Sequence, residues 1–225
     1  TLDNLLPLTP AQQGMAFESL AREPGSADPC HIQVALIVRG DLNRDAMLQA
    51  WKNIVARYDI LRLVLAPSRL ASGVAIIQEA SALDFRVIQL TGDAQERVRQ
   101  LKSMDLDEPF ELEQGPLIRL SIADLGNGEH AVMLSKHHVI LDGWSLMVIL
   151  FELAQGYGEQ LAGKNSVLKH GLSWPAHLEW LAAQDNVPAH QFWKQHLEAV
   201  STPSRVKFPT PTSVGRGNGE IYRLL

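Results

Sequence analysis

The pattern of apolar and polar positions predicts helices and strands that alternate along the chain. From Asn43 to Arg57, apolar side chains recur at steps of three and four residues, which is the spacing of an amphipathic helix. The largely apolar run from His31 to Val38 is closed by Arg39-Gly40-Asp41, which is typical of a strand followed by a turn. Two further apolar runs flank Asn127-Gly128, a dipeptide that favours the tight turn of an antiparallel hairpin.

Shorter patterns place the remaining elements. We expect helices over 11–17, 93–104, 144–156, 174–184 and 188–199, and strands over 60–65, 74–77, 85–88, 117–122 and 130–135. The helix over 144–156 is so apolar that the pattern predicts a buried helix with little exposed face. Pro, Ser, Thr and Gly collect in 202–219, as in a linker, and 220–225 resembles the start of another strand. These elements predict an α/β fold in which a mixed sheet is flanked by helices.

Composition narrows the class of protein. Of 225 residues, 46% are hydrophobic and 20% charged, which fits an ordinary globular chain and excludes a disordered one. The formal net charge of −5 argues against nucleic acid or an anionic membrane as a partner, and no apolar run is long enough to cross a bilayer. The single cysteine, Cys30, cannot form an intrachain disulfide, so we expect a cytoplasmic protein in which this thiol packs in the interior.

One constellation carries candidate chemistry, at the junction between the second hairpin strand and the following helix. His137 and His138 are adjacent, so on an extended segment their side chains point to opposite sides and one of them at most faces a substrate. An imidazole there can accept a proton or bind developing charge, while Asp142 can hold a ring or an arginine. Gly143 permits a tight turn and presents an amide at the helix N-terminus. The same residues equally fit two histidines at the edge of the core beside an ordinary Asp-Gly turn, and ligand counting argues against a metal.

The segment from His137 to Gly143 matches the HHxxxDG signature of the condensation domains of nonribosomal peptide synthetases, and Trp144-Ser145 continues it as in many members. Residues Leu6 to Met15 resemble the first core motif of that family. Residues Arg57 to Arg62 resemble its second motif, RHxxLR, with Tyr58 in place of the histidine. The three motifs stand in the order found in the family, and together they are a more specific signal than any one motif alone.

The resemblance implies a chloramphenicol-acetyltransferase-like lobe. Residues 1–201 would form the N-terminal lobe of a condensation domain, and 202–225 would be a linker and the start of the crossover toward a C-terminal lobe. In the family the reaction channel lies between the lobes. A donor and an acceptor peptidyl carrier protein bring substrates to it on 4′-phosphopantetheine arms, and an adenylation domain is adjacent. The domain has no cofactor or metal of its own, and it serves the biosynthesis of antibiotics and other secondary metabolites.

The resemblance also implies the reaction and the roles of the site residues. The α-amine of the acceptor attacks the donor thioester and forms a peptide bond, with His138 and Gly143 at the reaction centre. The residues expected to support the site are His137, Asp142, Arg57, Arg62, Trp144 and Ser145, with Asp142 paired to one of the two arginines. The opening motif leans toward an L-configured donor.

Two alternatives remain open at this stage. The first is a carrier-protein-binding module without chemistry, and the second is a CoA-dependent acyltransferase of the same superfamily. Alone, the lobe is expected to be inactive and to expose an apolar face.

Overall fold

The computed structural model describes residues 5–23, 25–66, 73–79, 83–164 and 173–202. The chain divides into two compact units, Thr1–Ala183 and Gln184–Leu225, and each is described by itself. Positions 203–225 lie outside the described residues, so the predicted linker beyond residue 202 and the strand over 220–225 are not described. In the described part of the chain, no helix is both long and apolar enough to cross a membrane.

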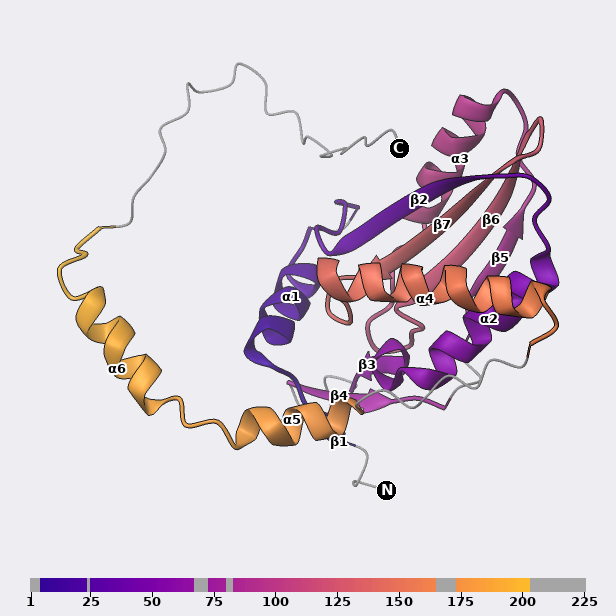
Figure 1. The fold of residues 1–225 in the computed structure, drawn as a ribbon. Coiled ribbons are helices and arrows are strands. Elements are labelled where there is room, and N and C mark those ends of the chain that lie inside the picture. The colour runs from indigo at the N-terminus through magenta and orange to yellow at the C-terminus, as the bar shows by residue number, and fades with distance from the viewer. Residues whose placement is uncertain (1–4, 24, 67–72, 80–82, 165–172, 203–225) are drawn as a thin grey trace, which may run out of the picture. The chain divides into compact units, whose positions relative to one another are not determined.

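The first unit is built on a four-stranded sheet. Its order is β2 (His31–Arg39), β7 (Glu129–His137), β6 (Ile118–Gly126) and β5 (Phe85–Ile88) (Figure 1). Strands β2, β7 and β6 pair antiparallel, whereas β5 runs parallel to β6. The predicted hairpin is confirmed: Asn127 and Gly128, with φ of 52° and 73°, join β6 to β7 in the left-handed region that this tight turn requires.

Helices cover both faces of this sheet (Figure 1). Helix α3 (Ala94–Leu106) buries Leu101 against Ala123 and Met133 on one face. Helices α2 (Arg44–Arg57) and α4 (Gly143–Leu161) pack over the other face. A Cβ added to Gly156 of α4 would lie 3.5 Å from the Cβ of Ala50, so these two helices approach closely. The expected mixed sheet flanked by helices is therefore confirmed.

A smaller antiparallel sheet has the order β1 (Leu5–Pro7), β4 (Val74–Ile77) and β3 (Leu63–Leu65). The strand predicted to begin at residue 60 begins only at Leu63, because a 3₁₀ turn, η2 (Asp59–Arg62), comes first. In that turn the Leu61 N–H donates to the Tyr58 carbonyl at 3.1 Å. The apolar pattern alone could not reveal this turn, since a short apolar run fits either conformation.

Three further helices complete the described structure. Helix α1 (Pro10–Leu20) begins at Thr9, whose side chain and that of Gln12 cap it reciprocally. Helix α5 (Trp174–Ala182) begins after Ser173, and the Trp174 N–H donates to the Asp59 carboxylate at 2.9 Å, which ties α5 to η2. Helix α6 (Val187–His196) belongs to the second unit and buries none of its residues there.

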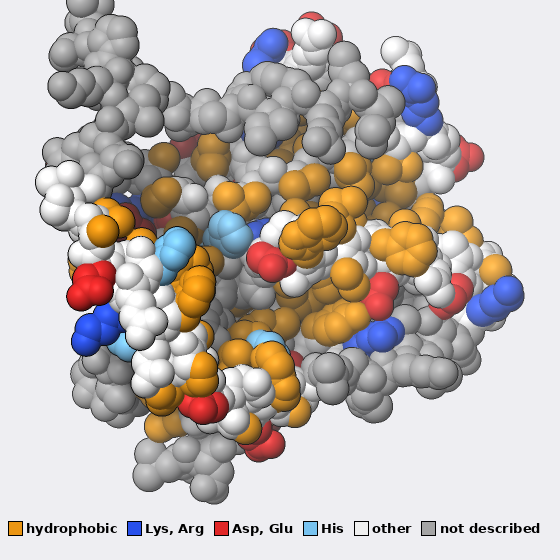
Figure 2. All heavy atoms as spheres, turned by 60° about the vertical axis from the view of Figure 1, so that its left-hand side comes forward, with side chains coloured by type: hydrophobic (Ala, Val, Ile, Leu, Met, Phe, Trp, Pro, Cys, Tyr) orange, Lys and Arg blue, Asp and Glu red, His pale blue; other side chains and the backbone are white. Residues whose placement is uncertain are grey.

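Helix α4 differs from its prediction. Leu146, Ile149 and Leu153 are buried, as an apolar helix requires. The opposite face, however, is apolar and exposed: its members are spaced by three and four residues and are Trp144 (86%), Met147 (61%), Val148 (50%) and Phe151 (71%). Hydrophobic side chains gather at the surface in the view of Figure 2. The predicted buried helix is therefore wrong for one face, and the expected exposed apolar surface is present.

Candidate active site

The pleat of β7 separates the two adjacent histidines. Met133 lies on the α3 side of the sheet, and Leu134 lies in the main core with α2 and α4. Because side chains alternate along a strand, His137 lies on the side of Met133, and Lys136 points to the side of Leu134. His138 follows one residue beyond the end of β7, with its side chain partly exposed, whereas His137 is fully buried. The predicted separation of the two rings is thus confirmed.

His137 is part of a buried hydrogen-bond chain. The Val139 N–H donates to its Nδ1 at 3.1 Å, so a neutral ring carries its proton on Nε2. That Nε2–H donates to the Ser19 hydroxyl at 2.9 Å, and the hydroxyl donates to an Asp28 oxygen, also at 2.9 Å. Burial opposes the charge of Asp28, but hydrogen bonds with His137, the Cys30 N–H and Ser19 outweigh it and hold its pKa at about 2. Both ring nitrogens of His137 therefore have partners within the protein, as the predicted supporting role requires.

His138 has the opposite tautomer. Its Nδ1 lies 2.9 Å from the Leu141 carbonyl oxygen, which can only accept, so Nδ1 carries the proton. In the neutral ring Nε2 then keeps its lone pair, and no hydrogen-bond partner for this atom is found in the described part of the chain. An imidazole fixed in this way can accept a proton from a substrate or orient it through Nε2.

The loop after His138 is held from several sides. The His138 N–H donates to the Cys30 carbonyl at 2.8 Å, and the Gln12 side chain donates to the Val139 carbonyl at 3.0 Å. The buried Lys136 ammonium donates to the Leu141 carbonyl at 2.5 Å. The motif around Gln12 and the HHxxxDG segment are therefore in direct contact, although more than a hundred residues separate them.

Asp142 and Gly143 begin helix α4. Asp142 is the N-cap, and its carboxylate accepts the Ser145 N–H at 2.7 Å, which keeps the pKa of this carboxyl below its ordinary value. Gly143 is the first helical residue, and a Cβ there would find no heavy atom within 4 Å among the described residues. Its φ is not positive, so the predicted tight turn is not the reason for a glycine at this position.

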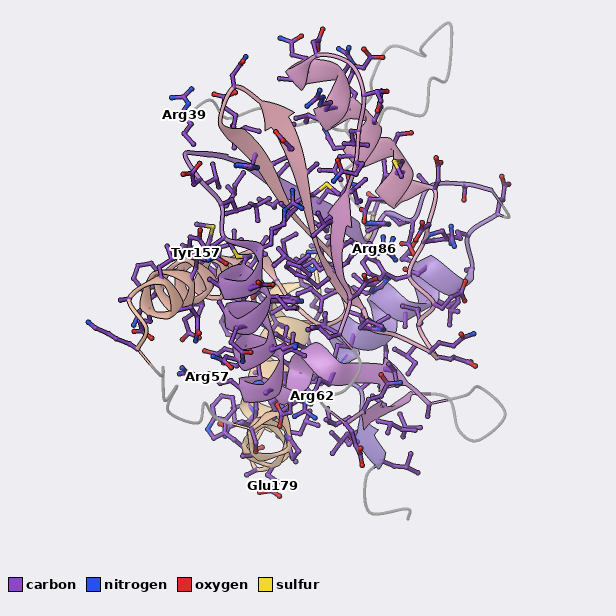
Figure 3. The ribbon with its side chains drawn as sticks, turned by 90° about the vertical axis from the view of Figure 1, so that its right-hand side faces the viewer. Arg39, Arg57, Arg62, Arg86, Tyr157 and Glu179 are labelled. Atoms are coloured by element: carbon purple, nitrogen blue, oxygen red, sulfur yellow. The ribbon has the colours of Figure 1, made fainter. Side chains whose placement is uncertain are left out.

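The expected ion pair between Asp142 and Arg57 or Arg62 is wrong. Both arginines lie near the C-terminal end of α2 (Figure 3). Arg57 pairs with Glu152 at 3.6 Å, and Arg62 donates to the carbonyls of Val55 and Gln78 at 3.2 and 2.6 Å. Asp142 is exposed, so its carboxylate is hydrated and needs no counter-charge beyond the hydrogen bond that it accepts as the helix cap.

The motif that contains these arginines links several elements instead. Tyr58, which replaces the family's histidine, donates its hydroxyl proton to Glu152 of α4 at 2.8 Å. Burial and this carboxylate both raise the pKa of Tyr58. Arg57 and Arg62 thus support the junction of α2, α4 and η2 and do not contact Asp142.

The remaining expected support residues lie in the first turn of α4. Ser145 contributes its backbone N–H to the cap, whereas the Trp144 side chain is 86% exposed. Trp144 therefore contributes little packing to the described site.

A possible metal-ligand group lies behind the site. Ligand atoms of Asp28, Cys30 and His137 are all within 4.8 Å of one another. Asp28 and His137 are already bonded to Ser19, and burial raises the pKa of the Cys30 thiol, which disfavours the thiolate that a metal binds. The donor set therefore fits a hydrogen-bonded core better than a metal centre, and Cys30 is buried as expected.

Sequence reasoning missed four residues that shape this site: Gln12, Ser19, Asp28 and Lys136. A signal existed for three of them. Gln12 and Ser19 share one face of α1 with the apolar, buried Ala16. Lys136 also interrupts an apolar alternation in β7. Asp28 carries no such signal, because it stands in a loop.

Comparison with known proteins identifies the family. The family model of the condensation domain matches residues 3–215. A linear gramicidin synthase of Brevibacillus parabrevis is 30% identical over 93% of this chain, and malpinin synthetase of Mortierella alpina is 30% identical over 92% of it. The chain spans only 3% of each of these relatives.

Solved structures support the same fold. The starter condensation domain of rhizomide synthetase RzmA superposes with a TM-score of 0.76 at 20% identity, over 88% of this chain and 49% of that one. The X-domain in complex with OxyB, from teicoplanin biosynthesis, gives 0.73 at 23% identity, over 90% and 45%. The chain thus spans about half the length of these structures, and the expected chloramphenicol-acetyltransferase-like fold is confirmed. The match over nearly the whole chain shows that it belongs to the condensation-domain family of nonribosomal peptide synthetases.

Proposed function

We propose that this chain supplies the N-terminal lobe, residues 1–201, of a domain that forms peptide bonds between carrier-bound substrates. Residues 202–225 would lead toward the C-terminal lobe. The observation that carries the proposal is the tautomer of His138, whose Nδ1–H is held by the Leu141 carbonyl and whose Nε2 is left to act on a substrate. The relatives, which are synthases of gramicidin and bacitracin, support the reaction class.

The reaction needs a positioned group more than a strong base. An α-amine has a pKa of about 8, so an appreciable fraction is neutral near pH 7 and can attack the donor thioester carbonyl directly. The new C–N bond forms, the C–S bond breaks, and the donor arm leaves as a thiol that takes up the proton released by the amine. His138 Nε2 accepts a hydrogen bond from the attacking amine, and this bond orients the amine. The imidazole then holds the proton of the amine while the tetrahedral intermediate exists.

The first turn of α4 supplies the second part of the site. The first N–H groups of an α-helix have no partner within the helix. The Ser145 N–H is one of them, and it donates to the Asp142 carboxylate. The Gly143 N–H at the same terminus is available to stabilise the oxyanion of the intermediate. The absence of a side chain at Gly143 leaves room for substrate beside it.

The partners follow from this proposal. A donor and an acceptor peptidyl carrier protein would bring their substrates on 4′-phosphopantetheine arms, and an adenylation domain would be adjacent. Since the chain spans about half the length of solved condensation domains, His138 would meet both substrates only when a C-terminal lobe closes the channel. Alone, the lobe would be inactive, because an open, wet site loses both positioning and electrostatic stabilisation.

A second candidate is a binding module without chemistry. The observation that favours it is the similarity to the X-domain, whose solved structure is a complex with OxyB. The intact His138 and its fixed tautomer favour chemistry.

The test joins this chain to a C-terminal lobe and supplies loaded donor and acceptor carrier proteins. The acceptor arm is followed by intact mass for the wild type, His138→Ala and, as a matched control, His190→Ala on exposed α6. A mass gain equal to the donor acyl group, lost only in His138→Ala, would support the proposal. Transfer from acyl-CoA alone would assign the chain to the wider acyltransferase superfamily, and carrier binding without any transfer would favour the binding module.

A further inference from the structure

The two residues that donate to the Leu141 carbonyl lie close together in the chain, Lys136 near the end of β7 and His138 just beyond the end of that strand. Lys136 and His138 are two positions apart, and the His137 side chain between them points to the other layer. Lys136 lies in register between Ile32 of β2 and Ile118 of β6, and only 2% of it is exposed. Its side chain therefore has a defined path from the sheet interior to the start of α4.

The Leu141 carbonyl accepts from both residues. Lys136 Nζ lies 2.5 Å from the oxygen, and His138 Nδ1 lies 2.9 Å from it. A carbonyl oxygen has two lone pairs, so it can serve both donors at once. Leu141 directly precedes Asp142, the N-cap of α4. The carbonyl oxygen that orients the imidazole is therefore fixed both by Lys136 from the sheet and by its place in the chain next to the start of α4.

Burying an ammonium group at this place costs free energy, because the charge loses its hydration. This cost indicates that the positive charge of Lys136 has a function here. Burial lowers the pKa of Lys136 to about 8, and the nearby Asp142 and Cys30 offset only part of that effect. An apolar side chain of the same length would fill the space without desolvating a charge. A methionine is such a side chain, and it would leave the Leu141 carbonyl with His138 as its single side-chain donor.

We propose that Lys136 is a positioning residue for His138, acting by fixing the Leu141 carbonyl that selects the imidazole tautomer and orientation. The proposal rests on the proposed function of His138, and it adds a residue outside the HHxxxDG signature. Without the ammonium, the 138–141 loop can shift, and the His138 ring can take the other tautomer, in which Nε2 is protonated and no longer an acceptor. A misplacement of the order of 1 Å can slow a reaction by about 100-fold, so a partial loss of order is expected to slow turnover by about tenfold.

The first measurement is made on the full chain with its eight histidine rings labelled with ¹⁵N. The His138 signals are assigned by their loss in His138→Gln. In the wild type we expect a protonated Nδ1 and an unprotonated Nε2. If the wild type instead carries its proton on Nε2, the proposal is overturned, and no variant is needed to show this.

The second measurement compares Lys136→Met with Lys52→Met, which removes the same charge from an exposed position on α2. Signals of the Nε2-protonated tautomer of His138 should appear in Lys136→Met and not in the control. In the two-lobed domain, kcat should fall about tenfold with KM for the acceptor unchanged, and Lys136→Arg should recover part of it. A folded Lys136→Met chain with unaltered His138 signals refutes the positioning role. Absence of condensation in the wild type would instead count against the proposed function and leave the tautomer measurement valid.

Discussion

Removing the Asp142 side chain should have a small, specific effect on stability, because this residue caps a helix and is exposed. Its carboxylate satisfies the Ser145 N–H at 2.7 Å at the start of a 19-residue helix. Loss of such a cap costs about 1 kcal/mol. In a chain of 225 residues this corresponds to a fall of about 2–4 °C in Tm. A buried ion pair broken at the same place would cost about 3–5 kcal/mol.

The assay is thermal unfolding of Asp142→Ala beside Asp142→Asn, which keeps the capping oxygen and loses the charge. We expect the Asn variant to stay within about 0.5 kcal/mol of the wild type, since Asn caps as well as Asp. The pKa of Asp142 is lowered in the folded chain, so the charged cap is favoured above the ordinary carboxyl value of 3.8 and its contribution declines as the pH falls below that value. The stability difference between wild type and Asp142→Ala should therefore shrink in acid. A loss above about 4 kcal/mol would refute the capping argument and restore a buried ionic role, while lost turnover with unchanged Tm would assign Asp142 to chemistry.

Three other outcomes follow from the structure. Burial opposes the charge of Asp105, but hydrogen bonds from His31 first and then Gln33 outweigh it and hold its pKa at about 2. The contribution of Asp105 to folding stability should therefore be nearly complete above about pH 4 and fall by about 2 kcal/mol as the pH drops toward 2. Urea unfolding across this range measures it, and Asp105→Asn should show a shallower fall; an equal slope would contradict the reasoning. Gly143→Ala should leave the free energy of unfolding within about 0.5 kcal/mol of the wild type, because the added Cβ meets no described atom of the chain. It should nevertheless slow condensation, because the methyl group would take up space proposed for substrate. A clear loss of stability would contradict the open surroundings of Gly143. The exposed apolar face of α4 should make the isolated lobe self-associate. Phe151→Ser, on that face, should weaken this association in sedimentation velocity without lowering Tm; a wild type that stays monomeric, or a variant that associates equally, would contradict this role of the face.

Local patterns predicted the parts of the fold that depend on local chemistry. The Asn127-Gly128 hairpin, the stripe of α2 and the separation of the two histidines all follow from residues within a few positions of one another. The links that complete the site join distant residues, such as Gln12 to Val139 and Ser19 to His137. No spacing rule reveals such contacts from one sequence.

The wrong prediction for Asp142 has the same origin. A buried carboxylate needs a counter-charge, and the two motif arginines were the obvious partners. The structure exposes the carboxylate and gives Arg57 a partner on α4, Glu152. Tertiary packing decides which side chains are buried, so the sequence alone could not show that the Asp142 carboxylate is exposed. The exposed face of α4 has the same explanation: apolar composition shows that a surface is to be covered, but not by what.

The hairpin turn controls more than the pairing of two strands. His138 lies ten positions after Gly128, which is about 33 Å of extended chain. Because the side-chain period of a strand is two residues, a slip of one position in the β6–β7 register would reverse which histidine meets Ser19 and which meets the Leu141 carbonyl. The positive φ angles of Asn127 and Gly128 fit a two-residue turn, which together with the pairing of β7 to β2 disfavours that slip. An insertion that shifted β7 by one position would thus exchange the places of the two rings. Such a change, far from the site, would remove its chemistry while leaving every site residue in the chain.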